Sequence, residues 1–211
     1  MKTDDFIKAL AGDEAVERGV IERSTLLGLA GAAVVAGLTF YATLGLRAGL
    51  TTHAVAVSTA IKICVTAPLA FFGVVAALRL ARPGAPHGLA LFLLFTPLAV
   101  LLLLLGIDFG LHGLADWRAR LFGRTSSVCS ALIVALSVLP FAALIHGLKN
   151  GASENPRLSG FVAGLAAAGV GATIYALHCP EDSALFMAAW YGAAALAMGV
   201  AGALAGRLLR W

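Results

Sequence analysis

Residues 127–148 read SVCSALIVALSVLPFAALIHGL, a stretch that contains no Asp, Glu, Lys or Arg. An α-helix rises 1.5 Å per residue, so about 20 apolar residues cross a hydrocarbon layer of about 30 Å. Lipid offers no partner to an exposed N–H or C=O, and a spanning segment must therefore satisfy its own backbone as a helix. The stretch predicts a transmembrane helix.

Similar apolar stretches lie on both sides of this one. The six stretches are Ser24–Leu46, Ala54–Leu78, Gly88–Ile107, Ser127–Leu148, Leu158–Leu177 and Ala184–Leu204. The connections between them are too short to hold a soluble domain. The sequence therefore predicts an all-α polytopic membrane protein, in which residues 24–211 form six transmembrane helices and residues 1–23 form a separate cytoplasmic segment.

The composition supports a lipid environment. Hydrophobic residues make up 60 % of the 211 residues and charged residues only 12 %, against roughly 25 % charged residues in soluble domains. The net charge is +4, but the basic residues lie mostly at the ends of apolar stretches. There they act as determinants of membrane topology. No basic stripe is interleaved with aromatic residues, so we expect no direct nucleic-acid binding.

The distribution of Lys and Arg predicts the orientation. If both termini are cytoplasmic, that side carries Lys2, Lys8, Arg18, Arg23, Arg79, Arg82, Lys149, Arg157, Arg207 and Arg210. The opposite side carries Arg47, Arg118, Arg120 and Arg124. This bias favours an N-in, C-in topology. The first 23 residues lack the features of a signal peptide and are expected to be retained.

Small residues and prolines punctuate the predicted spans. Gly160 and Gly164 form one GxxxG pair and Gly202 and Gly206 another, a spacing that lets helix backbones approach closely. These pairs could serve contacts within one bundle or between two, so the oligomeric state stays open. Pro68, Pro97 and Pro140 fall inside the second, third and fourth spans, and each is expected to bend its helix.

The N-terminal segment predicts a short amphipathic helix. Thr3 is a suitable N-cap, and Asp4 and Asp5 place negative charge at the positive end of the helix dipole. Apolar residues then recur on one face, namely Phe6, Ile7, Leu10 and Ala11. So short a helix is marginal alone in water. It is either a lead-in to the membrane or a docking helix for a cytoplasmic partner.

Lys62 lies within the second apolar stretch. A cation at the centre of a span costs about 2.5–3.5 kcal/mol on insertion scales. The side chain could extend outward to the membrane surface, or it could face the bundle interior and meet a carboxylate such as Asp108. The sequence leaves both interpretations open.

Two of the three cysteines fall at one predicted membrane face. Cys64 lies in an apolar stretch and is expected to be a small buried hydrophobe. Cys129 opens the fourth span and Cys179 follows the fifth, so both lie on the predicted outer side. They could form a disulfide, share a soft metal, or lie at the same depth by chance.

The tract around Cys179 is rich in reactive side chains. Residues 175–183 read YALHCPEDS, which places His178, Glu181 and Asp182 beside the thiol. Together with Cys129 these four residues are a candidate metal-binding set. The adjacency of His178 and Cys179 does not match usual chelate spacing, and a reactive thiol activated by the imidazole is favoured.

This tract, with the rest of the chain, resembles the NrsF family of bacterial inner-membrane anti-sigma factors. The similarity rests on the MKTDDFIKAL start, the LHCPEDSALFMAAWYG tract, the position of Cys129, and the ending Arg207-Leu208-Leu209-Arg210-Trp211. The resemblance implies a protein that holds an extracytoplasmic-function (ECF) sigma factor at the membrane. It also implies release on heavy-metal or oxidative stress, with Cys129 and Cys179 as the sensor thiols. We further interpret residues 3–7 and Leu10 as a sigma contact.

Two other classes of function compete with this interpretation. A membrane thiol oxidoreductase would use Cys129 and Cys179 and would need a quinone pocket or a thioredoxin-like partner, and no CxxC motif supports it. A small transporter would need more polar spans and an evident inverted repeat. We predict a regulator that is not an enzyme and has no cofactor.

Overall fold

The computed structural model describes residues 20–114 and 116–209, and helices are the regular elements found there. The α-helices are α2 (Val20–Thr43), α3 (His53–Leu80), α4 (Gly88–Leu93), α5 (Thr96–His112), α6 (Trp117–Phe122), α7 (Ser126–Leu148), α8 (Pro156–Ala176), α9 (Ala184–Phe186) and α10 (Gly192–Ala205). A π-helix, η1 (Met187–Tyr191), joins α9 to α10, and a 3₁₀ turn, η2 (Gly206–Leu209), follows. The all-α prediction is confirmed, whereas the predicted N-terminal helix lies outside the described residues.

Six helical segments of the described ranges are long and apolar enough to cross a membrane. They run Glu22–Thr43, His53–Leu80, Gly88–His112, Val128–Leu148, Pro156–Ala176 and Ala184–Leu209. Each overlaps one of the six stretches predicted from sequence, so their number and places are confirmed. The embedding in a bilayer and the N-in, C-in orientation remain predictions.

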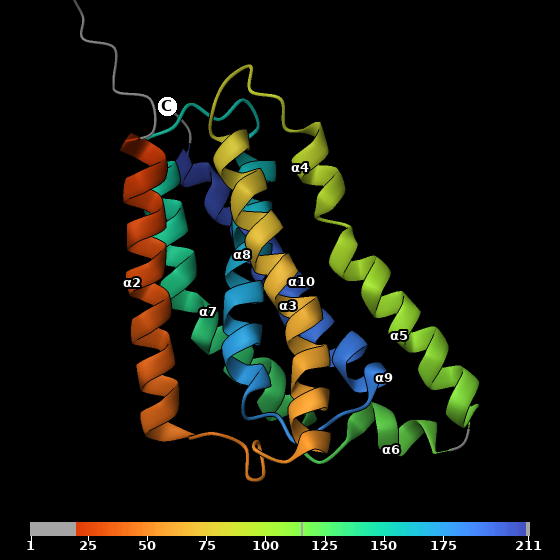
Figure 1. Ribbon diagram of the computed structural model, residues 1–211. Coiled ribbons are helices and arrows are strands. Elements are labelled where there is room, and N and C mark those ends of the chain that lie inside the picture. Colours follow the sequence, from red (N-terminus) through yellow and green to blue (C-terminus); the bar gives the residue numbers. More distant parts are fainter. Residues whose placement is uncertain (1–19, 115, 210–211) are drawn as a thin grey trace, which may run out of the picture.

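Helix α8 is the centre of the bundle. It packs against α3, α7 and α10, and it is the most buried of the six segments. Figure 1 shows α8 behind α3, with α5 standing apart on the other side of α3. The small side chains of α8 explain its position, because Ala and Gly let three neighbouring backbones approach one axis.

The two GxxxG pairs face each other across the α8–α10 contact. A Cβ added at Gly160 would meet the carbonyl of Gly202, and one added at Gly206 would meet the carbonyl of Pro156. Gly164 likewise lies against the backbone of Met198. The glycine pairs therefore serve a contact within one bundle.

The prolines act in two different ways. Pro68 and Pro140 lie inside α3 and α7, as predicted. Pro97 lies within the third apolar segment, Gly88–His112, as predicted, and that helix is interrupted at Leu94 and Phe95, so that Pro97 falls in the first turn of α5. A proline is tolerated there because the N–H groups of a first turn have no partner within the helix.

The bundle has two chemically different ends (Figure 1). One, here called the terminal end, contains the start of α2, the end of η2 and loops 81–87 and 149–155. The other, here called the thiol end, contains loop 44–52, α6 and turn 177–183. At the terminal end the two loops are joined, because Ala152 N donates to Ala81 O at 2.8 Å and Gly84 N donates to Glu154 Oε1 at 2.9 Å.

We expect Gly202→Ala to destabilise the protein, because the new methyl group would overlap the backbone of α8 at Gly160. Overpacking of this kind costs about 1–3 kcal/mol. The measurement is the thermal unfolding midpoint in detergent. Gly28→Ala is the matched control, since Gly28 has nothing within 4 Å of the added Cβ, and its midpoint should stay the same or rise slightly. Equal midpoints for the two variants would contradict the close α8–α10 contact.

Candidate functional site

The thiol end buries two cysteines side by side. Cys129, near the start of α7, and Cys179, in turn 177–183, are both 0 % exposed and belong to one cluster with Tyr175 and Tyr191. Both are free thiols, and Cys179 Sγ lies 3.8 Å from Glu181 O. Sequence reasoning left open whether the two lay at one depth by chance, and the structure brings them into contact.

A buried lysine fixes the turn that carries Cys179. The ammonium of Lys62, on α3, donates to Cys179 O at 2.8 Å and lies 2.9 Å from Asp182 Oδ1. Its side chain is only 5 % exposed. The guanidinium of Arg47 binds both oxygens of the Asp182 carboxylate, at 2.7 and 2.8 Å, and also donates to Cys179 O at 3.3 Å. The Lys62 ammonium from α3 and the Arg47 guanidinium from loop 44–52 therefore both bind the Asp182 carboxylate and the Cys179 carbonyl.

The predicted alternatives for Lys62 are decided by this geometry. Lys62 faces the interior, but its carboxylate partner is Asp182 and the suggested pairing with Asp108 is wrong. Asp108 instead accepts from Arg120 Nη1 at 2.8 Å and lies 3.3 Å from His112 Nδ1. A buried cation needs both charge compensation and hydrogen-bond acceptors, and turn 177–183 supplies both.

The remaining residues of the candidate metal-binding set point elsewhere. His178 Nδ1 lies 3.0 Å from Gly45 O, and its ring packs edge-on against Phe40. Glu181 Oε1 accepts from Arg124 N at 2.8 Å. Among the residues that the structure describes, no three His, Cys, Asp or Glu side chains are grouped to hold a metal ion. The five-residue set of Cys129, Cys179, His178, Glu181 and Asp182 is therefore not assembled, and only the two thiols stay together.

The surrounding charges favour a reactive thiol at Cys179. A hydrogen bond from Cys129 lowers the pKa of the Cys179 thiol, and the charge of Lys62 acts in the same direction, although burial opposes both. Partial burial raises the pKa of Asp182, but hydrogen bonds from Arg47 and Lys62 outweigh it and hold the pKa below its ordinary value of 3.8. The hydrogen bond to Asp182 also raises the pKa of Arg47, so this ion pair stays charged.

The π-helix η1 connects the sixth span to the thiol site. A π-turn leaves carbonyls without their usual partner in the helix, and Trp190 O accepts from Ser130 Oγ at 2.9 Å, next to Cys129. Trp190 Nε1 donates to Leu121 O of α6 at 2.7 Å. Tyr191 belongs to the buried cluster of the two cysteines, and Trp190 packs against that cluster. The η1 segment thus joins the sixth span to α6, to α7 and to the cysteines.

Sequence reasoning missed several of these residues. Arg47 was counted only as a topology signal, and Tyr191 was noted only within the family resemblance. One signal was present, since Arg47 and Asp182 carry opposite charges beside spans that end on the same predicted face. The π-helix left no such signal, because its sequence MAAWY is compatible with an ordinary α-helix.

Comparison with known proteins gives a consistent family assignment. The family model NrsF, described as negative regulator of sigma F, matches residues 10–211. The probable anti-sigma-F factor NrsF of Azospira oryzae is 37 % identical over 219 residues, which cover 100 % of both chains. The anti-sigma-F factor NrsF of Caulobacter vibrioides is 34 % identical over 226 residues, again over 100 % of both chains. No solved structure matches.

We expect Asp182→Asn to destabilise the thiol end, because the variant removes the negative charge that compensates buried Lys62. Breaking a fully buried pair costs about 3–5 kcal/mol, and the 38 % exposure of Asp182 reduces this to about 1–3 kcal/mol. The measurement is thermal unfolding in detergent at neutral pH. Asp116→Asn is the control, since Asp116 is an exposed αL residue that Asn replaces without strain.

The comparison of the unsubstituted protein with Asp182→Asn also has a predicted pH dependence. The folded pKa of Asp182 is below 3.8, so the carboxylate contributes its stability above that value and loses it as the pH falls through the folded pKa. The stability difference between the unsubstituted protein and Asp182→Asn should be constant near neutrality and shrink below about pH 4. A difference that already declines between pH 7 and 5 would contradict the assigned pairing.

Proposed function

Because this chain belongs to the NrsF family, we propose that it is a membrane-embedded anti-sigma factor that sequesters an ECF sigma factor. In this proposal it releases the sigma factor when heavy metal or oxidant reacts with Cys129 and Cys179. The names of both relatives support the anti-sigma role. The six apolar helices are compatible with a multi-pass protein of the bacterial inner membrane.

The observation that carries the sensing part is the position of the thiol pair. Cys129 and Cys179 touch each other at the end of the bundle opposite to the start of α2 and the end of η2 (Figure 1). In the proposed N-in, C-in topology, the thiols face the periplasm and the terminal end faces the cytoplasm. A periplasmic compartment is oxidising, so a thiol pair there would meet oxidants and metals first.

The terminal end is the proposed sigma-docking surface. Residues 1–19 precede α2 in the chain, and we propose that Thr3, Asp4, Asp5, Phe6, Ile7 and Leu10 contribute a docking helix. Loops 81–87 and 149–155 complete the surface, since they are already joined to each other. Arg82 Nη2 lies 2.6 Å from Glu22 Oε1, and this ion pair connects loop 81–87 to the start of α2.

Energetics distinguish the two proposed signals. Changing a partner from mostly bound to mostly free requires about 5.5 kcal/mol of differential affinity. A disulfide typically changes stability by about 2–4 kcal/mol, whereas a structural zinc–thiolate site supplies about 10–16 kcal/mol. The zinc figure refers to sites with a full set of four ligands, of which the two thiols supply half, so a metal drives release alone only if further ligands join them. Oxidation requires a sigma factor that is less tightly held.

The topology is testable with single cysteines in a background in which the three native cysteines are Ser. Thr51→Cys lies in loop 44–52 and Asn150→Cys in loop 149–155, and both positions are exposed. In intact spheroplasts a membrane-impermeant maleimide should label Thr51→Cys, and should label Asn150→Cys only after permeabilisation. The opposite labelling pattern would place the thiols in the cytoplasm and rule out a periplasmic sensor.

The function is tested by co-purification from the native cells. Detergent-extracted protein should retain an ECF sigma factor in unstressed cells and lose it after cadmium chloride or diamide. Cys129→Ser and Cys179→Ser should each abolish the loss. Cys64→Ser is the matched control, because Cys64 is exposed and outside the site, contrary to the burial expected from sequence. Absence of any sigma factor would refute the anti-sigma proposal, whereas normal release from both serine variants would refute only the sensing part.

A further inference from the structure

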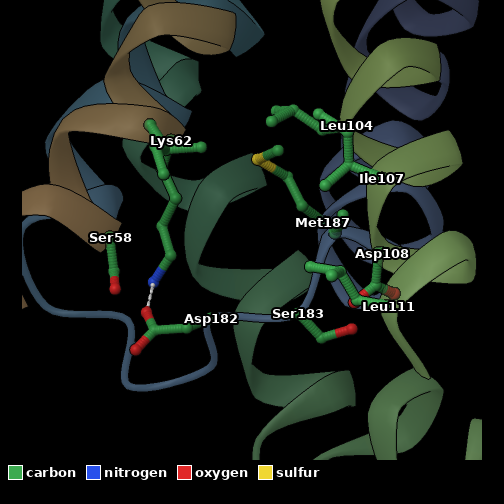
Figure 2. A pocket seen from close by; sticks show the side chains of 11 residues that line it. Ser58, Lys62, Leu104, Ile107, Asp108, Leu111, Asp182, Ser183 and Met187 are labelled. Atoms are coloured by element: carbon green, nitrogen blue, oxygen red, sulfur yellow. Dashed lines mark ion pairs between the residues drawn. The ribbon is translucent and has the colours of Figure 1, made fainter.

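A cavity of about 250 Å³ lies beside the thiol end, between α3, α5 and the α9–η1 segment. Figure 2 shows its two kinds of wall. The polar wall consists of Ser58, Lys62, Asp108, Asp182 and Ser183. The apolar wall includes Ile61, Leu104, Ile107, Leu111 and Met187. Helix α5, which carries much of the apolar wall, is the least buried of the six segments, so this side of the cavity adjoins the lipid-facing surface.

The polar wall offers donors that the described residues do not use. A lysine ammonium has three N–H donors, and Lys62 has two assigned acceptors, Cys179 O and Asp182 Oδ1. The hydroxyl oxygen of Ser183 is buried without a hydrogen-bond partner within the described residues, but it has almost no accessible surface, so the third proton of Lys62 is the donor left for an occupant. A buried donor without an acceptor costs about 1–3 kcal/mol. The cavity therefore favours a ligand that brings hydrogen-bond acceptors.

The carboxylates of the wall restrict the charge of that ligand. Asp182 already binds Arg47, and Asp108 already binds Arg120. Because both acids are neutralised by a guanidinium, a metal ion or an amine gains little there. Lys62, Arg47 and Arg120 outnumber these two acids, so charge alone does not repel an anion. An anionic head group would, however, lose its hydration against the apolar side chains that make up most of the lining. The wall thus favours a neutral acceptor with an apolar body.

We propose that this cavity binds the head group of a lipid-soluble quinone, with one ring carbonyl accepting from Lys62. A quinone has neutral carbonyl acceptors on a flat apolar ring, which the side chains of Leu104, Ile107 and Met187 can enclose. The volume is slightly below the 300–1,000 Å³ usual for small-molecule sites, which suits a single ring. An isoprenoid tail would leave past α5 toward lipid.

The position of this cavity connects it to the proposed sensor. Met187 belongs to the same buried cluster as Cys129 and Cys179, and Lys62 both lines the cavity and holds the Cys179 carbonyl. An occupant would share the Lys62 ammonium with turn 177–183. That connection depends on the proposed function, whereas binding of the quinone does not.

The test is titration of the purified full-length protein, free of sigma factor, with decylubiquinone in detergent by calorimetry. The expected result is saturable binding at one site, weakened at least ten-fold by Leu104→Trp, which fills the cavity. Leu103→Trp is the matched control, because Leu103 is the neighbouring residue on α5 and is 65 % exposed. It should bind like the unsubstituted protein.

Lys62→Met provides the second variant and should weaken binding by a similar factor. Equal affinity of Leu104→Trp and Leu103→Trp, or uptake that never saturates, would overturn the proposal. Displacement of the quinone by dioleoylglycerol at equal concentration would also overturn it, because the site would then be a general ester-carbonyl site for lipids. The sigma co-purification is independent of these outcomes, so the two proposals can fail separately.

Discussion

The buried ammonium of Lys62 is the constraint on which the thiol end depends. A charge that is only 5 % exposed must be paired and hydrogen-bonded, and here both requirements fall on one turn through Asp182 and the carbonyl of Cys179. The turn can meet them only if it folds back over the end of α3. That fold places Cys179 against Cys129, so the contact between the two sulfurs is a consequence of how the lysine is satisfied.

The same constraint extends along the bundle through two helices. Helix α3 carries Lys62 near the thiol end and runs to the terminal end, where Ala81 O accepts from Ala152 N. The sixth span carries Tyr191 beside Cys179 and reaches Gly206, whose backbone lies against Pro156. The contacts at the ends of these two helices cannot change gradually, because ion pairs and glycine-mediated backbone contacts are either formed or broken. Two rigid elements therefore connect the thiols to the proposed docking surface, as coupling between distant sites requires.

The sequence predicted the parts of this arrangement that follow from single residues or from periodicity. The six apolar stretches were readable because each helix must satisfy its own backbone in lipid. The glycine spacing predicted a close contact, but the helix that receives it depends on the fold. Lys62 was recognised as an unusual residue for an apolar span, yet its partner was misassigned. Asp108 and Asp182 are both acidic residues near one predicted membrane face, and only the fold shows that Asp108 forms its ion pair with Arg120. The Lys62–Asp182–Arg47 network joins three distant segments, and no local pattern reports it.

If α3 crosses the membrane as proposed, a lysine within it is costly, and that cost clarifies the role of Lys62. An apolar residue at position 62 would avoid an insertion penalty of about 2.5–3.5 kcal/mol, and buried ion pairs are often no more stable than well-packed apolar side chains. The gain lies in specificity, because an apolar side chain would accept many positions of turn 177–183, whereas the ammonium accepts the one that presents Asp182 and the Cys179 carbonyl together. In the proposed sensing role, the two thiols react as a unit and need their sulfurs held in one geometry until the signal arrives. The Lys62–Asp182–Arg47 network costs stability but is either formed or broken, and it therefore meets that need better than a larger apolar core.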